Sequence, residues 1–353
     1  METVSLEQSF LSIFTLITFF IFLIVSKYSH KIKKGILLDQ DFLKPQAFHS
    51  LAISRCGGIA GVVSFNIFLL IYYSLYSKIL YEYIFICNLM FLIGFLDDFK
   101  INISPFKRLL LMIIFLFFSI YFLPIKILNI DIFLLSSLLQ INIFSSFFVL
   151  LCFLFIINGA NLIDGFNGLL TINLIIINIV LLYINISSGN DEFSIFLIAQ
   201  ITILLCFLLF NFPNAKIFLG DSGSYLMGSL VALNTIITNN LNQNYSSFFF
   251  CILLFYLFFE VFFSFIRKIN QKKSPVHPDN EHLHMLSYQI MSNKFGRDKG
   301  NFLNSMLINF IYLIVVLPAL FFAKDPVISR YWFFSLIVIY LLIYLRLYRL
   351  TKN

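Results

Sequence analysis

The sequence predicts an all-α polytopic integral membrane protein with about eleven transmembrane helices, forming one membrane domain over residues 1–353. Three observations predict this class. Hydrophobic residues make up 60% of the chain, charged residues make up only 12%, and the polar residues lie in short stretches between long apolar runs. Ordinary soluble domains carry about 25% charged residues. The composition therefore excludes a soluble enzyme.

Each apolar run is long enough for a helix of about 20 residues, which crosses the hydrocarbon core of a bilayer. The runs are continuously apolar and do not alternate, which favours helices over the strands of a barrel. They lie at 9–26, 57–77, 79–96, 107–124, 143–162, 168–185, 193–210, 222–238, 247–266, 303–323 and 330–347.

The positions of Lys and Arg indicate the orientation. If the N-terminus lies outside, twenty of the 24 basic residues fall on the cytoplasmic side and four on the outer side. Because basic residues concentrate on the cytoplasmic side of membrane proteins, we expect the N-terminus outside and the C-terminus in the cytoplasm. This asymmetry also explains the net charge of +7 without nucleic acid. The expected cytoplasmic loops are 27–56, 97–107, 163–167, 211–221 and 267–302.

Acidic and amide side chains form two clusters at the ends of apolar runs. Asp97 and Asp98 close the third run, and two adjacent carboxylates require a cation or strong donors unless both are solvated. Asn161 and Asp164 follow the fifth run on one helical face, beside glycines that allow close approach of a ligand. Two solvated carboxylates and a plain inter-helix turn are the simpler interpretations of these patterns.

Two further clusters lie on later loops. Asp221 and Ser222 stand at the start of the eighth run, where backbone N–H groups suit an anion, although simple helix capping uses the same residues. The largest loop combines Arg267 with His282 and His284, a set suited to phosphate binding or proton transfer. A solvated basic loop is the alternative. Zinc is discounted because no cysteine lies near these histidines.

All four clusters fall on the same predicted side of the membrane, so we expect them to share one cleft. Several carboxylates beside several cations predict a phosphate site bridged by Mg²⁺, with Mn²⁺ as an alternative. Hard oxygen ligands hold such an ion, and Lys and Arg bind the remaining phosphate oxygens.

In this order, the motifs resemble those of the polyprenyl-phosphate N-acetylhexosamine-1-phosphate transferases, glycosyltransferase family 4. They read Leu96-Asp97-Asp98, Asn158-x-x-Asn161-x-x-Asp164-Gly165-x-x-Gly168-Leu169, Pro213-x-Ala215-Lys216-x-Phe218-x-Gly220-Asp221-x-Gly223-Ser224 and Ser274-Pro275-x-x-Pro278-Asp279-x-x-His282-Leu283-His284. An upstream element, His49 followed by Arg55-x-Gly57-Gly58, is similar to the family's first cytoplasmic loop. The last motif resembles most the bacterial branch that transfers GlcNAc-1-phosphate to undecaprenyl phosphate.

The resemblance implies an enzyme of the bacterial inner (plasma) membrane with its active site on the cytoplasmic face. It would transfer a sugar-1-phosphate from a UDP-N-acetylhexosamine to undecaprenyl phosphate and release UMP, starting O-antigen, cell-surface polysaccharide or teichoic-acid-linkage synthesis. The expected partners are these two substrates and membrane lipid, with no nucleic acid; a homodimer stays open.

The resemblance also assigns roles to residues. It implies that Asp221 and Asn161 hold the metal ion and that the catalytic residues are Asp97, Asp98 and Asp164. Whether the aspartate pair deprotonates the lipid phosphate or organises the metal is left open. The substrate-binding residues that it implies are Lys107 for the lipid phosphate, Phe218 for the uracil, Asn167 near the nucleotide, and Arg267, His282 and His284 on a loop over the diphosphate and sugar.

The chain departs from the family pattern at three positions. Glu260 replaces an Asp, Met285 replaces a frequent third His, and Asn167 replaces an Asp that is common in bacterial members. Two alternatives remain. One is the related phospho-MurNAc-pentapeptide translocase, which uses a different donor. The other is a lipid-glycan flippase or transporter, which would carry its charged residues at mid-membrane and not at one face.

Overall fold

The computed structural model describes residues 2–29, 31, 37–39, 52–101, 103–275 and 279–352, with side chains from residue 7 onward. His49 and residues 276–278 of the fourth motif lie outside the described residues. The elements are α1 (Glu2–Tyr28), β1 (Leu38–Asp39), β2 (Ile53–Ser54), α2 (Gly57–Tyr76), the π-helix η2 (Tyr83–Cys87), α3 (Asn88–Asp98), α4 (Pro105–Phe122), α5 (Phe133–Leu138), α6 (Asn142–Ile163), α7 (Leu169–Ser187), α8 (Asp191–Asn211), α9 (Gly220–Leu241), α10 (Ser247–Leu253), α11 (Phe255–Asn270), α12 (Leu283–Phe295), α13 (Arg297–Phe321) and α14 (Pro326–Lys352).

The chain is an all-α helix bundle, and every predicted apolar window contains a helix. Within the described residues, eight helices are long and apolar enough to cross a membrane, or nine if α10 and α11 form one span. The axes of those two helices differ by 76°, so the window 247–266 is not one straight helix. The count of eleven remains a prediction, because α9 is rich in polar residues and the window 79–96 contains a π-helical segment.

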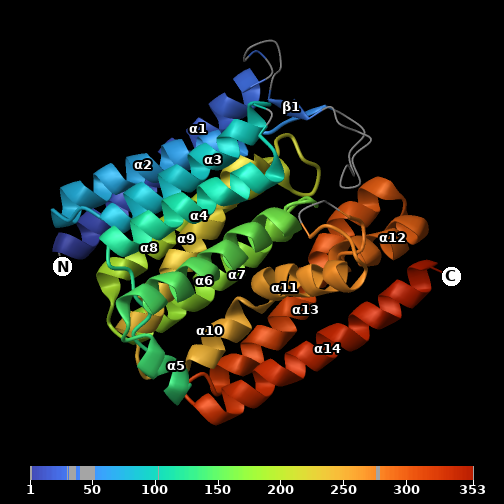
Figure 1. The fold of residues 1–353 in the computed structure, drawn as a ribbon. Coiled ribbons are helices and arrows are strands. Elements are labelled where there is room, and N and C mark those ends of the chain that lie inside the picture. The colour runs from blue at the N-terminus through green and yellow to red at the C-terminus, as the bar shows by residue number, and fades with distance from the viewer. Residues whose placement is uncertain are drawn as a thin grey trace.

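Helix α9 lies inside the bundle and packs most extensively against α3 and α6 (Figure 1). Two glycines on those contacts allow the helices to approach closely. A Cβ atom on Gly94 of α3 would clash with the carbonyl oxygen of Asp221, and one on Gly228 of α9 would lie 2.9 Å from the Cα of Ile157. The backbone of α9 is therefore held directly against both neighbours.

A buried amide network fixes α9 in register with the helices around it. The Asn234 Oδ1 atom accepts hydrogen bonds from Tyr83 (2.7 Å) and Gln200 (3.1 Å), and its Nδ2 atom donates to Asn178 (2.9 Å). These side chains come from η2, α8 and α7. Because hydrocarbon offers a polar group no other partner, such a network holds the helices in one arrangement.

The chain before α2 is attached to the loop before α9. The strands β1 and β2 pair antiparallel. The Phe218 N–H group donates to the carbonyl oxygen of Ser54 at 2.8 Å, and the Gly57 N–H group donates to the carbonyl oxygen of Phe218 at 2.9 Å. The start of α2 and the start of α9 are thereby fixed side by side.

The two chain ends lie at opposite ends of the bundle (Figure 1). The hairpin β1–β2, the ends of α3 and α6, the loop before α9 and helix α12 all lie at the end that carries the C-terminus, which we call the site end. These five stretches, which are far apart in sequence, therefore gather on one side.

Candidate functional site

Asp98 caps a helix that is remote in sequence. Its carboxylate accepts the backbone N–H groups of Asp221 (3.0 Å) and Ser222 (2.9 Å), and the side chain is fully buried. The first N–H groups of a helix have no partner within that helix, so a carboxylate placed there satisfies them and interacts favourably with the helix dipole. Both carboxylate oxygens of Asp98 are thus hydrogen-bonded to the backbone at the start of α9.

Asp97 points instead toward a shared cation. The Arg108 Nη1 atom lies 2.9 Å from Asp97 Oδ1 and 2.6 Å from Asp221 Oδ2. One guanidinium from α4 therefore joins a carboxylate at the end of α3 to one at the start of α9. The side chain of Asp97 is 34% exposed, which leaves it open to a ligand.

The resemblance assigns Lys107 to the lipid phosphate, and in the structure the neighbouring residue Arg108 contacts the carboxylates. Ser104 caps α4 by accepting from the Lys107 N–H group, and Pro105 occupies the first turn. The Ser104 cap and Pro105 fix where α4 begins and therefore which of its residues face the site. Consecutive residues on a helix point about 100° apart. Lys107 is consequently exposed beside the site while Arg108 faces the carboxylates.

Asn161 and Asp164, at the end of α6, face the same region. The Ser224 hydroxyl of α9 donates to Asn161 Oδ1 at 2.8 Å. Asp164 is half-buried, and no hydrogen bond or ion pair to another described residue is observed for its carboxylate. Burial raises the pKa of Asp164 well above its usual value, and the nearby carboxylates of Asp221 and Asp98 raise the pKa further.

Asn167 serves as a connector between loops. Its Nδ2 atom donates to the carbonyl oxygen of Pro213 at 2.9 Å, and its backbone N–H group donates to Asn301 Oδ1 at 2.9 Å. These bonds join the loop after α6 to the loop before α9 and to α13. An ionised Asp could not donate the side-chain bond to Pro213, so Asn at this position has a structural reason.

Phe218 lies in the loop before α9, where its ring is half-buried. The backbone bonds to Ser54 and Gly57 hold this residue in place. The aromatic ring therefore lies on the same loop as Asp221, three residues away.

Arg267 is engaged by two carboxylates. Its Nη2 atom donates to Asp279 at 2.9 Å and its Nη1 atom donates to Glu281 at 2.8 Å, while the side chain is 7% exposed. Burial alone would raise the pKa of Asp279, but the charges of His282, Arg267 and Lys268 hold this pKa below its usual value. Arg267 thus anchors the loop after α11.

His282, which directly precedes α12, and His284, in its first turn, are both buried. The His282 ring lies 3.2 Å from Glu260 Oε1, and the Tyr340 hydroxyl donates to Glu260 Oε2 at 2.7 Å. The two imidazole rings stack with centroids 5.5 Å apart. Burial lowers the pKa of His284 to about 3, so this ring is neutral at pH 7. Both oxygens of the Glu260 carboxylate therefore have partners, at His282 and at Tyr340.

The site residues form two groups joined by one loop. Asp97, Asp98, Asn161, Asp164 and Asp221 surround the start of α9, while Arg267, His282 and His284 lie on α11 and α12. Phe166, in the loop between Asp164 and Asn167, packs its ring 5.8 Å from that of His284 and 4.9 Å from that of Tyr288. Residues of the third and fourth motifs are thus connected through the second.

Within the described ranges, no group of three His, Cys, Asp or Glu side chains is arranged to hold a metal ion. The donor set of the first group nevertheless fits Mg²⁺. Asp97 and Asp221 converge on one cationic nitrogen, and the Asp164 carboxylate has no observed partner among the described side chains. Carboxylate and amide oxygens are the protein ligands that Mg²⁺ prefers.

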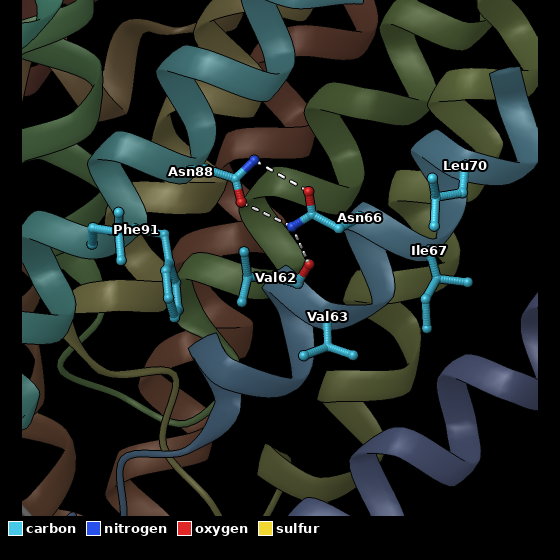
Figure 2. Close-up of a pocket in the computed structure, with 8 residues that line it drawn as sticks. Val62, Val63, Asn66, Ile67, Leu70, Asn88 and Phe91 are labelled. Carbon is cyan, nitrogen blue, oxygen red and sulfur yellow. Dashed lines mark hydrogen bonds between the residues drawn. The ribbon is translucent and has the colours of Figure 1, made fainter.

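A groove of about 390 Å³ lies between α2 and α3, away from these residues. Figure 2 shows the polar side chains among its lining residues, the amides of Asn66 and Asn88, which are hydrogen-bonded to each other at 2.8 and 3.2 Å. The rest of the lining is apolar, as at Leu70 and Phe91. Such a surface suits hydrocarbon and offers a polar substrate no free group.

Residues 80–239 match the model of glycosyl transferase family 4, which confirms over this segment the family that the motifs indicate. The matched segment includes all five residues around the start of α9, whereas Arg267, His282 and His284 lie beyond it.

Curated relatives match a stretch of similar length. The undecaprenyl-phosphate alpha-N-acetylglucosaminyl 1-phosphate transferase of Thermotoga maritima is 31% identical over 155 residues, which cover 43% of this chain and 45% of that protein. The phospho-N-acetylmuramoyl-pentapeptide-transferase of Streptococcus agalactiae is 36% identical over 156 residues, 41% of this chain and 45% of that protein. The matched stretch spans less than half the length of these relatives.

Proposed function

We propose that this chain, which carries a glycosyl transferase family 4 segment, transfers a sugar-1-phosphate from a UDP-N-acetylhexosamine to undecaprenyl phosphate. The observation that carries the proposal is the convergence of Asp97 and Asp221 on Arg108 at one end of an apolar helix bundle. A polyprenyl chain dissolves in the bilayer around such a bundle, whereas a nucleotide sugar arrives from water. A charged site at the end of the bundle is accessible to both substrates.

In the proposed reaction, an oxygen of the lipid phosphate attacks the β-phosphorus of the nucleotide sugar. A new phosphorus–oxygen bond forms to the lipid phosphate, and the bond from the β-phosphorus to the bridging oxygen breaks. UMP leaves with that oxygen, and the lipid carries a diphosphate sugar. Both reactants are anions, so their repulsion is the main electrostatic obstacle to reaction.

Mg²⁺ would reduce this repulsion, because a divalent ion neutralises phosphate oxygens and the charge that develops on the leaving group. Asp221 with Asn161 would hold the ion, and Asp97 is the partly exposed carboxylate beside them. Asp98 supports the site through the backbone of α9, as its two N–H contacts suggest. Arg108 adds positive charge for phosphate oxygens.

The remaining residues have proposed binding roles. Lys107 lies exposed next to Arg108 and would attract the lipid phosphate from the membrane surface. Phe218 would offer its ring to uracil, and Asn167 would support the nucleotide through the loops that it joins. Asp164, partly exposed, would contact the nucleotide sugar or the metal ion. His282 and His284, together with Arg267, would hold the loop over the diphosphate and sugar.

We propose further that the site end faces the cytoplasm of a bacterial inner (plasma) membrane. The uneven split of basic residues supports this orientation, because UDP-sugars are cytoplasmic metabolites and basic loops stay on that side. The N-terminus would then lie outside and the C-terminus inside.

Transfer of phospho-MurNAc-pentapeptide is the second candidate, because several matched relatives carry that name. The two activities share the lipid acceptor and differ in the donor. Purified protein with Mg²⁺ and undecaprenyl phosphate should therefore be given UDP-GlcNAc, UDP-GalNAc and UDP-MurNAc-pentapeptide in parallel. We expect UMP release with an N-acetylhexosamine donor. Release with the pentapeptide donor alone would select the second candidate, and release with none of them would refute both.

A further inference from the structure

Arg108 occupies the position between two carboxylates where a bridging cation would bind. Its Nη1 atom contacts Asp221 at 2.6 Å and Asp97 at 2.9 Å. Its guanidinium lies 6.0 Å from the ring centroid of Tyr225, which supports the group from one side. The Arg108 side chain is therefore held by two carboxylates and one aromatic ring, and it is 17% exposed.

The charges around this position do not balance. Asp97, Asp98 and Asp221 carry three formal negative charges, while Arg108 neutralises one. Arg55 approaches Asp98 only to 3.9 Å and is already bound by Asp39 at 2.7 Å. A monovalent guanidinium leaves the cluster short of positive charge, whereas a divalent ion would supply more charge at the same carboxylates.

We propose that the Arg108 guanidinium competes with the divalent ion for Asp97 and Asp221. The guanidinium is the counter-ion of the metal-free protein and leaves the pair when the metal binds, because two cations cannot share these oxygens without strong repulsion. The displaced guanidinium is then free for a phosphate oxygen. The inference rests on the proposed function for the identity of that anion.

Metal binding and anion binding are linked as a consequence. An anion that holds Arg108 away from the carboxylates raises the affinity for the metal, and by reciprocity the metal raises the affinity for the anion. The free enzyme would therefore keep these carboxylates paired with Arg108 at low metal concentration, and a phosphate substrate would lower the metal concentration needed to displace it.

The first test measures Mn²⁺ affinity by electron paramagnetic resonance on the purified full chain. We expect Arg108→Gln to bind Mn²⁺ about tenfold more tightly than wild type, within the usual range of coupling between sites. Lys107→Gln removes the neighbouring exposed charge and is the matched control, with a change of less than about twofold expected. Equal or weaker Mn²⁺ binding by Arg108→Gln would overturn the proposal.

The second test needs no variant, so misfolding cannot obscure it. Phenylglyoxal modifies accessible arginines, and peptide mass spectrometry reports each site separately. We expect Mn²⁺ to increase the modification of Arg108 several-fold and to leave the exposed Arg297 unchanged. Unchanged or reduced modification of Arg108 would contradict displacement. Neither readout uses catalysis, so failure of the transferase assay with these results intact would refute the proposed function alone.

Discussion

Asp98 holds the backbone of Asp221: one oxygen of its carboxylate accepts the Asp221 N–H group at 3.0 Å, and the other accepts that of Ser222. Gly220 makes this contact possible, since its φ of +77° turns the chain into α9 and a Cβ atom there would lie 2.6 Å from the Asp98 carboxylate. The adjacent residues Asp97 and Asp98 therefore have different roles. Asp98 holds the start of α9 in place, and the side chain of Asp97 faces the site.

We predict that Asp98→Ala destabilises the protein by about 1–3 kcal/mol, because two backbone N–H groups at the start of α9 lose their acceptor. Asp97→Ala should leave stability nearly unchanged and reduce turnover. Thermal unfolding of both variants in detergent, alongside activity, checks the division of roles. Equal unfolding temperatures for the two variants would contradict it.

Asp221→Ala is expected to abolish turnover, because it removes the carboxylate that Arg108 and the proposed metal ion share. The backbone N–H group that Asp98 binds is retained, so the variant should stay folded. Asp191→Ala, an exposed carboxylate at the start of α8, is the control with unchanged activity. Activity above about a tenth of wild type in monodisperse Asp221→Ala protein would argue against an essential role.

The helices could be predicted because hydropathy is a local property of the chain. The break at Leu254 between α10 and α11 could not, since the window 247–266 is apolar on both sides of it. The hydropathy of this window does not indicate the 76° change of direction between the two helices. The amide network around Asn234 is likewise visible only when four separate segments are placed together.

For the site, the sequence motifs predicted the types of residue that gather there. They did not predict which of two neighbouring residues makes each contact. Lys107 and Arg108 are neighbours of the same charge, and the phase of α4 alone decides which one reaches Asp221. The same holds for Asp97 and Asp98, whose roles depend on where α9 begins. The burial of His284 follows from loops and helices that meet across long sequence distances.

Gly58→Ala should destabilise the protein by about 1–3 kcal/mol through overpacking. A Cβ atom at this position would lie 2.5 Å from the backbone nitrogen of Gly223, so α2 and α9 would have to separate. Because Gly223 lies two residues after Asp221, activity should fall as well. Gly165→Ala is the control, since a Cβ atom added there would meet no heavy atom within 4 Å. Thermal unfolding temperatures that match for both variants would exclude this close contact.

The Asp279 carboxylate should stabilise the loop after α11 at neutral pH. Because its pKa is lowered in the folded protein, this contribution is present above the unfolded value of about 3.9 and is lost as the pH falls through the lower folded value. The difference in unfolding temperature between wild type and Asp279→Asn should stay constant from about pH 7 to 5 and narrow below about pH 4.

If the Asp279→Asn difference already narrowed between about pH 7 and 5, a group with a higher pKa would control the loop, and the ionised Asp279 would not be the cause.

The most direct test of phosphosugar transfer follows the β-phosphate of the donor. UDP-GlcNAc labelled with ³²P at the β-phosphorus should be incubated with the purified protein, Mg²⁺ and undecaprenyl phosphate, with a chelator in a parallel reaction. We expect the label to enter the lipid fraction, unlabelled UMP to be released in equal amount, and the chelator to stop both. Label that remains in a released nucleotide while sugar appears on the lipid would contradict phosphosugar transfer.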